Sequence, residues 1–204
     1  MTDRIRQVEH VEGNFSTSVV IEVLGEDYVG LTLLRDAAKE RLLQLTGISP
    51  NMASSYHLSL SRQVFLKPHM IGAFLDRITS VFKAHIDRGV LFLKPEFRVY
   101  LNESRDTAFL AVPVDLDISP KCLELIALTD KVLEDFDLPN YYANPSPHVS
   151  LGCVANSDGF PGIPESSMFL DTINIPPEDL DDFRVEFSQI TVFVGRTVHR
   201  IHLT

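Results

Sequence analysis

Two short stretches of this chain alternate strictly between polar and apolar residues. They read His57-Leu58-Ser59-Leu60 and His148-Val149-Ser150-Leu151. An alternation of period two is typical of a half-buried strand, so each histidine shares one strand face with the serine two positions on. The aliphatic residues between them point to the opposite face, toward a core. The pattern therefore predicts two matched strands that carry the same pair of polar side chains.

The other strands are predicted from runs of β-branched and aromatic residues bounded by turn residues. Together with the two motif strands, the predicted strands are 16–24, 56–66, 97–101, 108–114, 148–153, 184–194 and 198–203. The first motif lies in 56–66 and the second in 148–153. A polar turn at 102–106 joins one pair of neighbouring strands. Gly195-Arg196 forms the turn between the last two.

Three longer stretches place apolar residues at the spacing of an amphipathic helix. Their ranges are 29–46, 68–86 and 119–136. Gly47 is expected to stop the first helix, and Pro68 opens the second at a permitted position. The third has Ser119 as its expected N-cap and Pro120 at its first position. The predicted apolar stripes are Leu31, Leu34, Ala38, Leu42 and Leu45; Ile71, Leu75, Ile78 and Phe82; and Leu123, Ile126, Val132, Leu133 and Phe136.

Short antiparallel strands mixed with helices predict the α+β class rather than a parallel doubly wound sheet. Each half of the chain offers a motif strand, a helix and further antiparallel strands. We therefore expect one domain over 1–204 with two pseudo-symmetric lobes, helices on the outside and the motif strands side by side at a central cleft. A turn-rich stretch, 138–147, leads into the second motif strand. Residues 154–180 are rich in Pro, Gly, Asp and Ser and are predicted to be an irregular surface insertion.

Composition narrows the class of protein. The chain has 204 residues, of which 45% are hydrophobic and 23% charged, as expected of a soluble globular domain. The charged N-terminus and the lack of a long apolar run lead us to expect neither a signal peptide nor a membrane partner. Cys122 and Cys153 give no disulfide framework, so we expect reduced intracellular thiols. The formal net charge of −10 opposes bulk attraction to nucleic acid but is compatible with a locally basic site.

The two motifs combine imidazole and hydroxyl groups, which together suit phosphodiester chemistry. A histidine near its reference pKa of about 6.5 can take or give a proton at neutral pH. One imidazole can accept a proton from an attacking hydroxyl while the other donates one to the leaving oxygen. Serine hydroxyls can hydrogen-bond the non-bridging phosphate oxygens. We expect this chemistry to need no metal and no cofactor.

Other roles for these residues are weighed against that hypothesis. A single histidine on a strand more often has a hydrogen-bonded structural role, whereas two identical motifs at strand positions favour a shared site. A zinc site is disfavoured because no Cys, Asp or Glu stands at ligand spacing beside either histidine. A serine hydrolase is disfavoured because the chain lacks a G-x-S-x-G elbow.

The paired motif resembles that of the 2H phosphoesterase superfamily, and its flanking residues resemble the U6 snRNA phosphodiesterases within it. The resemblance covers the chain from about residue 10 to its end. The stretches that carry it are Gly13-Asn14-Phe15, His57-Leu58-Ser59-Leu60-Ser61, Pro68-His69 and Tyr142-Ala143-Asn144-Pro145-Ser146-Pro147-His148-Val149-Ser150-Leu151. Position 147 departs from the family, because some members carry an aromatic residue there.

The resemblance implies a 3′–5′ exoribonuclease that trims the oligouridine tail of U6 snRNA. It leaves a 2′,3′-cyclic phosphate or a 3′-phosphate. Carried over residue by residue, His57 and His148 form the catalytic pair, Ser59 and Ser150 bind phosphate, and the ring of Tyr142 stacks on a nucleobase. The substrate's own 2′-hydroxyl would be the nucleophile. The sequence leaves open which histidine is the base.

The family's partner is a single-stranded uridine-rich RNA 3′ end, which implies a nuclear location, and we expect a monomer. Candidate cations for holding RNA are Arg62, Lys67, Arg98 and Arg196. Two alternatives remain: a cyclic phosphodiesterase acting on small or tRNA-derived substrates, and a non-catalytic RNA-binding module.

Overall fold

The computed structural model describes residues 13–23, 29–94, 96–102, 104–160, 168–170 and 183–204. The helices are α1 (Val29–Thr46), α2 (Pro68–His85) and α3 (Lys121–Glu134). The strands are β1 (Phe15–Val23), β2 (Asn51–Met52), β3 (Tyr56–Ser59), β4 (Val64–Leu66), β5 (Gly89–Phe92), β6 (Phe97–Leu101), β7 (Thr107–Pro113), β8 (His148–Ala155), β9 (Met168–Leu170), β10 (Arg184–Phe187), β11 (Gln189–Val194) and β12 (Thr197–His202). Separate helices and antiparallel strands confirm the predicted α+β class.

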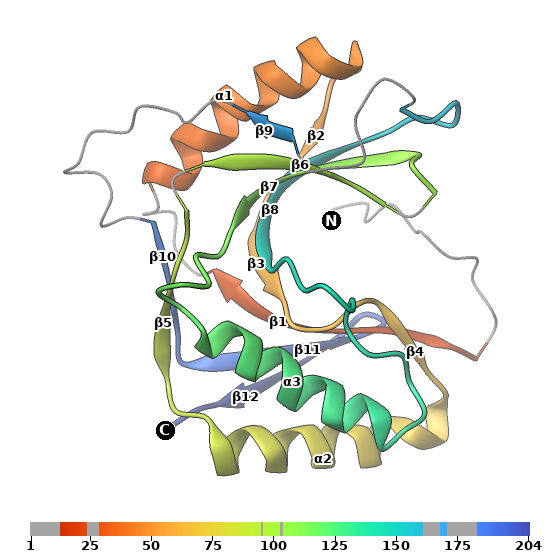
Figure 1. The fold of residues 1–204 in the computed structure, drawn as a ribbon. Helices are drawn as coiled ribbons and strands as arrows, with labels where there is room; N and C mark the ends of the chain where they lie inside the picture. The colour runs from red at the N-terminus through yellow and green to blue at the C-terminus, as the bar shows by residue number, and fades with distance from the viewer. Residues whose placement is uncertain (1–12, 24–28, 95, 103, 161–167, 171–182) are drawn as a thin grey trace.

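One long, curved sheet holds most of the strands (Figure 1). Its order is β12-β11-β1-β3-β8-β7-β6-β9, with β4 beside β1 and β2 beside β8. The motif strands β3 and β8 are antiparallel neighbours in the middle of this order. Each is flanked on its other side by a further antiparallel strand, β1 beside β3 and β7 beside β8. The predicted meeting of the two motif strands at the centre of the fold is confirmed.

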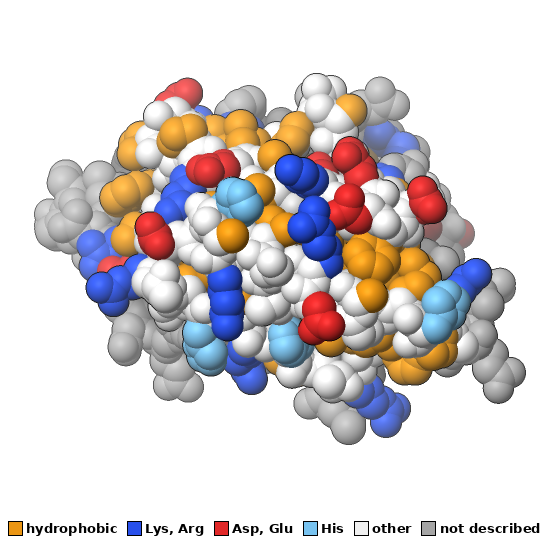
Figure 2. All heavy atoms as spheres, turned by 90° about the horizontal axis from the view of Figure 1, so that it is seen from below, with side chains coloured by type: hydrophobic (Ala, Val, Ile, Leu, Met, Phe, Trp, Pro, Cys, Tyr) orange, Lys and Arg blue, Asp and Glu red, His pale blue; other side chains and the backbone are white. Residues whose placement is uncertain are grey.

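The helices cover the outer side of the curved sheet (Figure 1). α1 lies over one lobe, and α2 and α3 lie together over the other, beside β12. The Arg77 Nε and Asp135 Oδ2 atoms are 2.7 Å apart, and the rings of Phe74 and Phe136 meet edge-on at 5.4 Å between centroids. Figure 2 shows the face of the molecule on which α2 and α3 lie, and acidic, basic and histidine side chains are interspersed over it. None of the helices in the described ranges has the length and apolar character that a membrane crossing requires.

The distribution of the helices departs from the predicted symmetry. α3 follows β7 in the chain, yet it packs against α2 in the other lobe. Its buried residues are Cys122, Leu125, Ile126, Thr129, Val132 and Leu133. Leu123, which we placed on the apolar stripe, is 39% exposed. The buried stripe is therefore rotated from the predicted one and includes Cys122 and Thr129.

Several predicted elements agree with the structure closely. The first predicted helix matches α1, and the backbone N–H of Gly47 caps it by donating to the Leu43 carbonyl at 2.8 Å. Gly47 has a φ of 69°, which favours glycine. The described part of the α1 stripe is fully buried, while the side chains of Leu34 and Leu45 lie outside the described residues. The strands at 97–101 and 108–114 form the expected pair.

The apolar halves of the two motifs form the centre of the core. Leu58, Leu60, Val149 and Leu151 are all fully buried. Burying one such side chain stabilises the fold by about 1.5–3 kcal/mol. A one-residue slip of either strand would move these side chains to the polar face, so the hydrophobic pattern holds the histidines in place.

The range 56–66, predicted as one strand, is broken. β3 ends at Ser59 and β4 begins at Val64, and both pair with β1. Ser59 pairs with Val20 and Val64 pairs with Thr17, so the four residues 60–63 lie opposite only two residues of β1. The extra residues form a bulge. The prediction of one continuous strand was therefore wrong.

Ser61 stabilises this bulge. Its Oγ accepts the backbone N–H of Val19 at 2.9 Å, while the Leu60 N–H donates to the Val19 carbonyl at 2.8 Å. Ser61 is buried, so the hydroxyl replaces a ladder partner that the bulge removes from Val19. The bulge thus fixes where the first motif strand ends.

Two further boundaries differ from the predictions. Ser119 does not cap α3: its Oγ accepts the Phe92 N–H at 2.7 Å, and Pro120 occupies the N-cap position. The predicted strand 184–194 is interrupted at Ser188, because β10 pairs with β5 in a separate small sheet while β11 pairs with β1.

The predicted insertion at 154–180 is partly built into the sheet. β8 continues to Ala155, and β9 pairs with β6. Residues 161–167 and 171–180 of the predicted insertion lie outside the described residues, as does the predicted strand end at residue 24.

The bulge gives a stability prediction. Ser61→Ala removes the acceptor of the buried Val19 N–H, and we expect the free energy of unfolding to fall by about 1–3 kcal/mol. Urea denaturation followed by circular dichroism measures the change. The exposed Ser54→Ala is the control, and equal stability of the two variants would contradict the role given to Ser61.

Candidate active site

The register of β3 and β8 brings the two motifs together. Leu58 lies opposite Val149 in this antiparallel pair. Continuing the register by one residue each way places His57 opposite Ser150, and Ser59 opposite His148. Directly opposed side chains have Cβ atoms about 4.5–5.5 Å apart, and diagonal ones about 7–8 Å. The two imidazoles therefore occupy one diagonal of a four-residue cluster, and the two hydroxyls occupy the other.

This cluster has the arrangement that a phosphate group needs. All four side chains are partly exposed, whereas the leucines and valine between them are buried. Histidines on a diagonal leave space for a tetrahedral phosphorus between them, with one imidazole on each side of it. The two hydroxyls are then available as hydrogen-bond donors to the remaining oxygens.

The hydrogen bond at Nδ1 of His148 defines the tautomer of its neutral ring. This atom lies 2.8 Å from the carbonyl oxygen of Ser146. A carbonyl oxygen only accepts hydrogen bonds, so Nδ1 carries the proton and Nε2 of the neutral ring has the free lone pair.

The protonation of His148 is set by its surroundings. Burial is the main influence and lowers the pKa of His148 below its ordinary value, while the bond to the Ser146 carbonyl raises this pKa in part. The Tyr100 ring stacks on the imidazole with 4.7 Å between centroids and an interplanar angle of 16°. At neutral pH His148 is therefore uncharged and able to accept a proton.

His57 has a different neighbour. Glu22 of β1 lies directly opposite it in the β1–β3 pair. The Thr191 hydroxyl donates to Glu22 Oε2 at 2.8 Å, and Arg200 Nε lies 3.6 Å from the same oxygen. The first motif histidine thus stands beside a carboxylate that is fixed in position by β11 and β12.

Tyr142 lies in the segment that leads into β8. It is 50% exposed, and the Arg62 guanidinium carbon is 4.4 Å from the centre of its ring. Tyr141 beside it is mostly buried and anchors the segment, because its N–H donates to Asp130 Oδ1 at 2.7 Å. An exposed ring next to a buried one fits the predicted stacking role of Tyr142 better than a structural role.

The candidate cations are distributed unevenly. Besides Arg62, Arg98 lies near the second motif, where its guanidinium is paired with Glu96 at 2.6 Å. Lys67 and Arg196 are exposed in the turns that follow β4 and β11 and do not belong to the motif strands.

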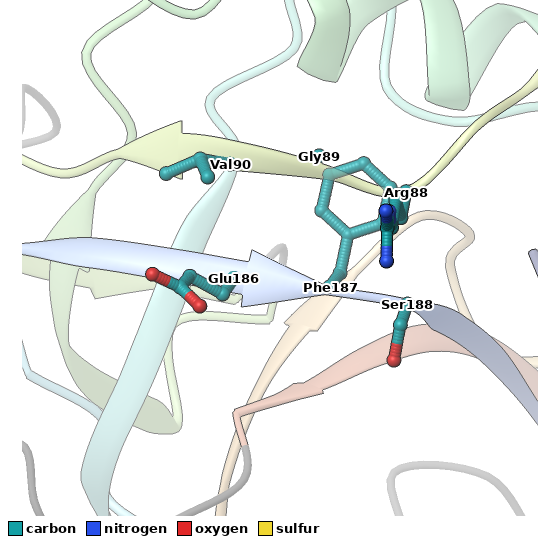
Figure 3. A pocket seen from close by; sticks show the side chains of 6 residues that line it. All are labelled: Arg88, Gly89, Val90, Glu186, Phe187 and Ser188. Carbon is teal, nitrogen blue, oxygen red and sulfur yellow. The ribbon is translucent and has the colours of Figure 1, made fainter.

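Two hollows lie outside the histidine cluster. A small one of about 140 Å³ borders the second motif, and its lining residues are Lys94, Arg98, Pro113, Val114, Leu116, Asp117, Pro145, Ser146 and Pro147. A larger one of about 450 Å³ lies where β5 and β10 meet (Figure 3), and its lining residues are Arg88, Gly89, Val90, Glu186, Phe187 and Ser188. The larger hollow contains no residue of either motif.

Sequence analysis missed three residues around the cluster, namely Tyr100, Ser146 and Glu22. The alternation in strand 97–101 does put Arg98 and Tyr100 on one face. That alternation alone leaves open which element this face meets, because the neighbours of β6 depend on the topology of the whole sheet.

The chain is similar in sequence to known proteins over about three quarters of its length. The chain is 32% identical over 163 residues to U6 snRNA phosphodiesterase 1 of Drosophila melanogaster, covering 76% of this chain and 58% of the relative. It is 28% identical over 148 residues to the Dictyostelium discoideum protein of that name, covering 72% and 53%. The human protein of that name is 28% identical over 169 residues, covering 76% and 56%. The chain thus spans slightly more than half the length of these curated relatives.

Solved structures share the fold. Kluyveromyces marxianus Usb1 matches with a TM-score of 0.66 at 16% identity, covering 92% of this chain and 98% of that one. Escherichia coli LigT in apo form matches with a TM-score of 0.50 at 10% identity, covering 94% and 95%. These likenesses show that the chain shares the fold of these two solved structures.

A family model named HVSL and described as "Uncharacterised conserved protein" matches residues 2–202, almost the whole chain. The four letters of its name are the residues of the second motif, His148-Val149-Ser150-Leu151. The similarity to the U6 snRNA phosphodiesterases predicted from the motifs is confirmed by the curated relatives. The chain belongs to the HVSL family.

Proposed function

We propose that this chain is a phosphodiesterase that shortens single-stranded RNA from its 3′ end, with the oligouridine end of U6 snRNA as its substrate. The observation that carries the proposal is the β3–β8 register, which brings two imidazoles and two hydroxyls to one patch of sheet. The names of the curated relatives support the choice of RNA. A structure of Kluyveromyces marxianus Usb1 with uridine monophosphate, at 15% identity and a TM-score of 0.65, supports a nucleotide ligand on this fold.

The proposed reaction uses the RNA's own 2′-hydroxyl. One histidine removes its proton, and the oxygen attacks the adjacent phosphorus. The new P–O2′ bond forms as the P–O5′ bond to the terminal nucleoside breaks, and the second histidine protonates the departing 5′-oxygen. The shortened RNA then ends in a 2′,3′-cyclic phosphate. A linear 3′-phosphate requires a second step in which water attacks phosphorus and the P–O2′ bond breaks.

We assign the base to His148 and the acid to His57. His148 is held neutral by burial, and its Nε2 lone pair is free because Nδ1 is bonded to Ser146. His57 stands opposite the carboxylate of Glu22, which favours a ring that carries a proton. Ser59 and Ser150 would bind the non-bridging oxygens and stabilise the charge that develops on them.

We propose further contacts and a setting for this reaction. Tyr142 would stack on a base of the RNA, with Arg62 holding its ring from the other side. The partner is the RNA 3′ end, the place of action is the nucleus, and the unit is a monomer. We expect no metal or cofactor in the reaction.

The catalytic pair is tested on 5′-labelled oligouridine RNA in the presence of EDTA. We expect stepwise shortening by the wild-type protein. His57→Ala and His148→Ala should each lose at least about 100-fold in rate, the usual contribution of general acid–base catalysis. Gel electrophoresis of the products measures both effects.

His85→Ala is the matched control, because His85 is exposed on α2 and also bonds a carbonyl oxygen through Nδ1. A 2′-deoxy nucleotide before the scissile phosphate should block cleavage. Loss of wild-type activity in EDTA would exclude the metal-free reaction. Activity on cyclic nucleotides but not on RNA would favour the small-substrate alternative, and binding without cleavage would favour the binding module.

The assignment of the base predicts a pH profile. A base works in its neutral form, and the pKa of His148 is lowered, so its activity should persist below the pH at which an ordinary histidine protonates. We expect the acid limb of kcat/KM to have its midpoint below about 6.5. Initial rates between pH 4 and 9 measure this, and a midpoint well above 6.5 would contradict the assignment.

A further inference from the structure

Tyr100, Ser146 and His148 form a closed set of contacts beside the motif strands. The Tyr100 ring stacks on the His148 imidazole, and the Tyr100 hydroxyl lies 3.1 Å from Ser146 Oγ. The Ser146 carbonyl in turn accepts the His148 Nδ1 proton. The three residues come from β6, from the segment before β8, and from the first position of β8.

We propose that Tyr100 is the positioning residue of His148: its ring fixes the plane of the imidazole, and its hydroxyl holds the serine whose carbonyl orients Nδ1. This inference rests on the proposed function, in which His148 is the base. It assigns a role to a residue of another strand that neither motif contains.

The geometry explains why both contacts are needed. A histidine side chain turns about two covalent bonds. The hydrogen bond to Ser146 fixes the position of Nδ1 but still allows the plane of the ring to tilt about this atom. A parallel ring at 4.7 Å removes this rotation, because an offset stack holds the two planes together. With both contacts in place, Nε2 is held in one direction.

The source of the restraint is the sheet. Tyr100 belongs to β6, which pairs with β7 and β9. Ser146 lies in an irregular segment between two prolines, Pro145 and Pro147. The hydroxyl contact therefore ties a residue without regular secondary structure to a strand whose position is fixed on both edges.

The same stack covers one side of the imidazole. The other ionisable groups on this face include His57 of β3, Arg98 of β6 and Cys153 of β8. Toward the other lobe the same face carries Glu22 of β1 and Arg200 of β12. Removing the Tyr100 ring would admit water to His148, and hydration favours the protonated ring. A base that protonates more readily becomes inactive at a higher pH. The midpoint of the acid limb of kcat/KM should therefore move to a higher pH.

The test compares Tyr100→Leu with Tyr100→Phe. For Tyr100→Leu we expect kcat to fall by about 10- to 100-fold with little change in KM, the loss typical of a displaced catalytic group. We also expect an upward shift of the His148 titration followed by NMR. Tyr100→Phe keeps the ring, so its titration should match the wild type. Phe92→Leu removes an exposed ring of β5, outside both motif strands, and is the control.

The hydroxyl contact is tested separately. Tyr100→Phe and Ser146→Ala break the same hydrogen bond, so each should lower kcat by a similar factor and the double variant by no more than either one. Independent, multiplying losses would overturn this part of the proposal. These conservative variants also decide the matter if Tyr100→Leu fails to fold by circular dichroism.

An unchanged titration and an unchanged kcat in Tyr100→Leu would overturn the proposal. The NMR titration needs no turnover, so it distinguishes this failure from failure of the proposed function. If His148→Ala kept full activity, the base assignment would fall, whereas a shifted His148 titration in Tyr100→Leu would still establish the contact.

Discussion

The antiparallel pairing of β3 with β8 is the constraint on which the site depends. The pairing joins two lobes whose strands otherwise pair within their own half of the sheet. It places each histidine opposite the serine of the other strand, so neither motif forms the four-residue cluster alone. The buried aliphatic residues of both motifs hold the register, because any slip would exchange the core face for the polar face. Folding of the core and assembly of the site are thus one event.

Two nearly identical motifs give two different chemical environments. His148 is partly buried under Tyr100 and bonded through Nδ1 to a carbonyl, whereas His57 stands opposite Glu22. The difference comes from the neighbouring strands and not from the motifs themselves. Acid–base chemistry needs one ring that accepts a proton and one that donates it, so this asymmetry supports a division of labour between chemically equal side chains.

Local patterns predicted much of this structure, and the failures share one physical cause. Period-two alternation identified both motif strands and their core residues, and helical spacing identified α1 to the residue. The bulge after Ser59, the redirected hydroxyl of Ser119 and the packing of α3 on α2 each depend on a partner distant in sequence. Tyr100 was missed for the same reason. The motif histidines were found because the same alternation of His and Ser with apolar residues occurs in both strands and involves only neighbouring residues.

The division of labour is tested most directly with RNA whose scissile 5′-oxygen is replaced by sulfur. A thiolate leaves without a proton, so loss of the acid no longer matters, while the 2′-hydroxyl still needs a base. On this substrate we predict that His57→Ala recovers most of its lost rate and that His148→Ala does not. Recovery by His148→Ala instead, or equal recovery by both variants, would contradict the account.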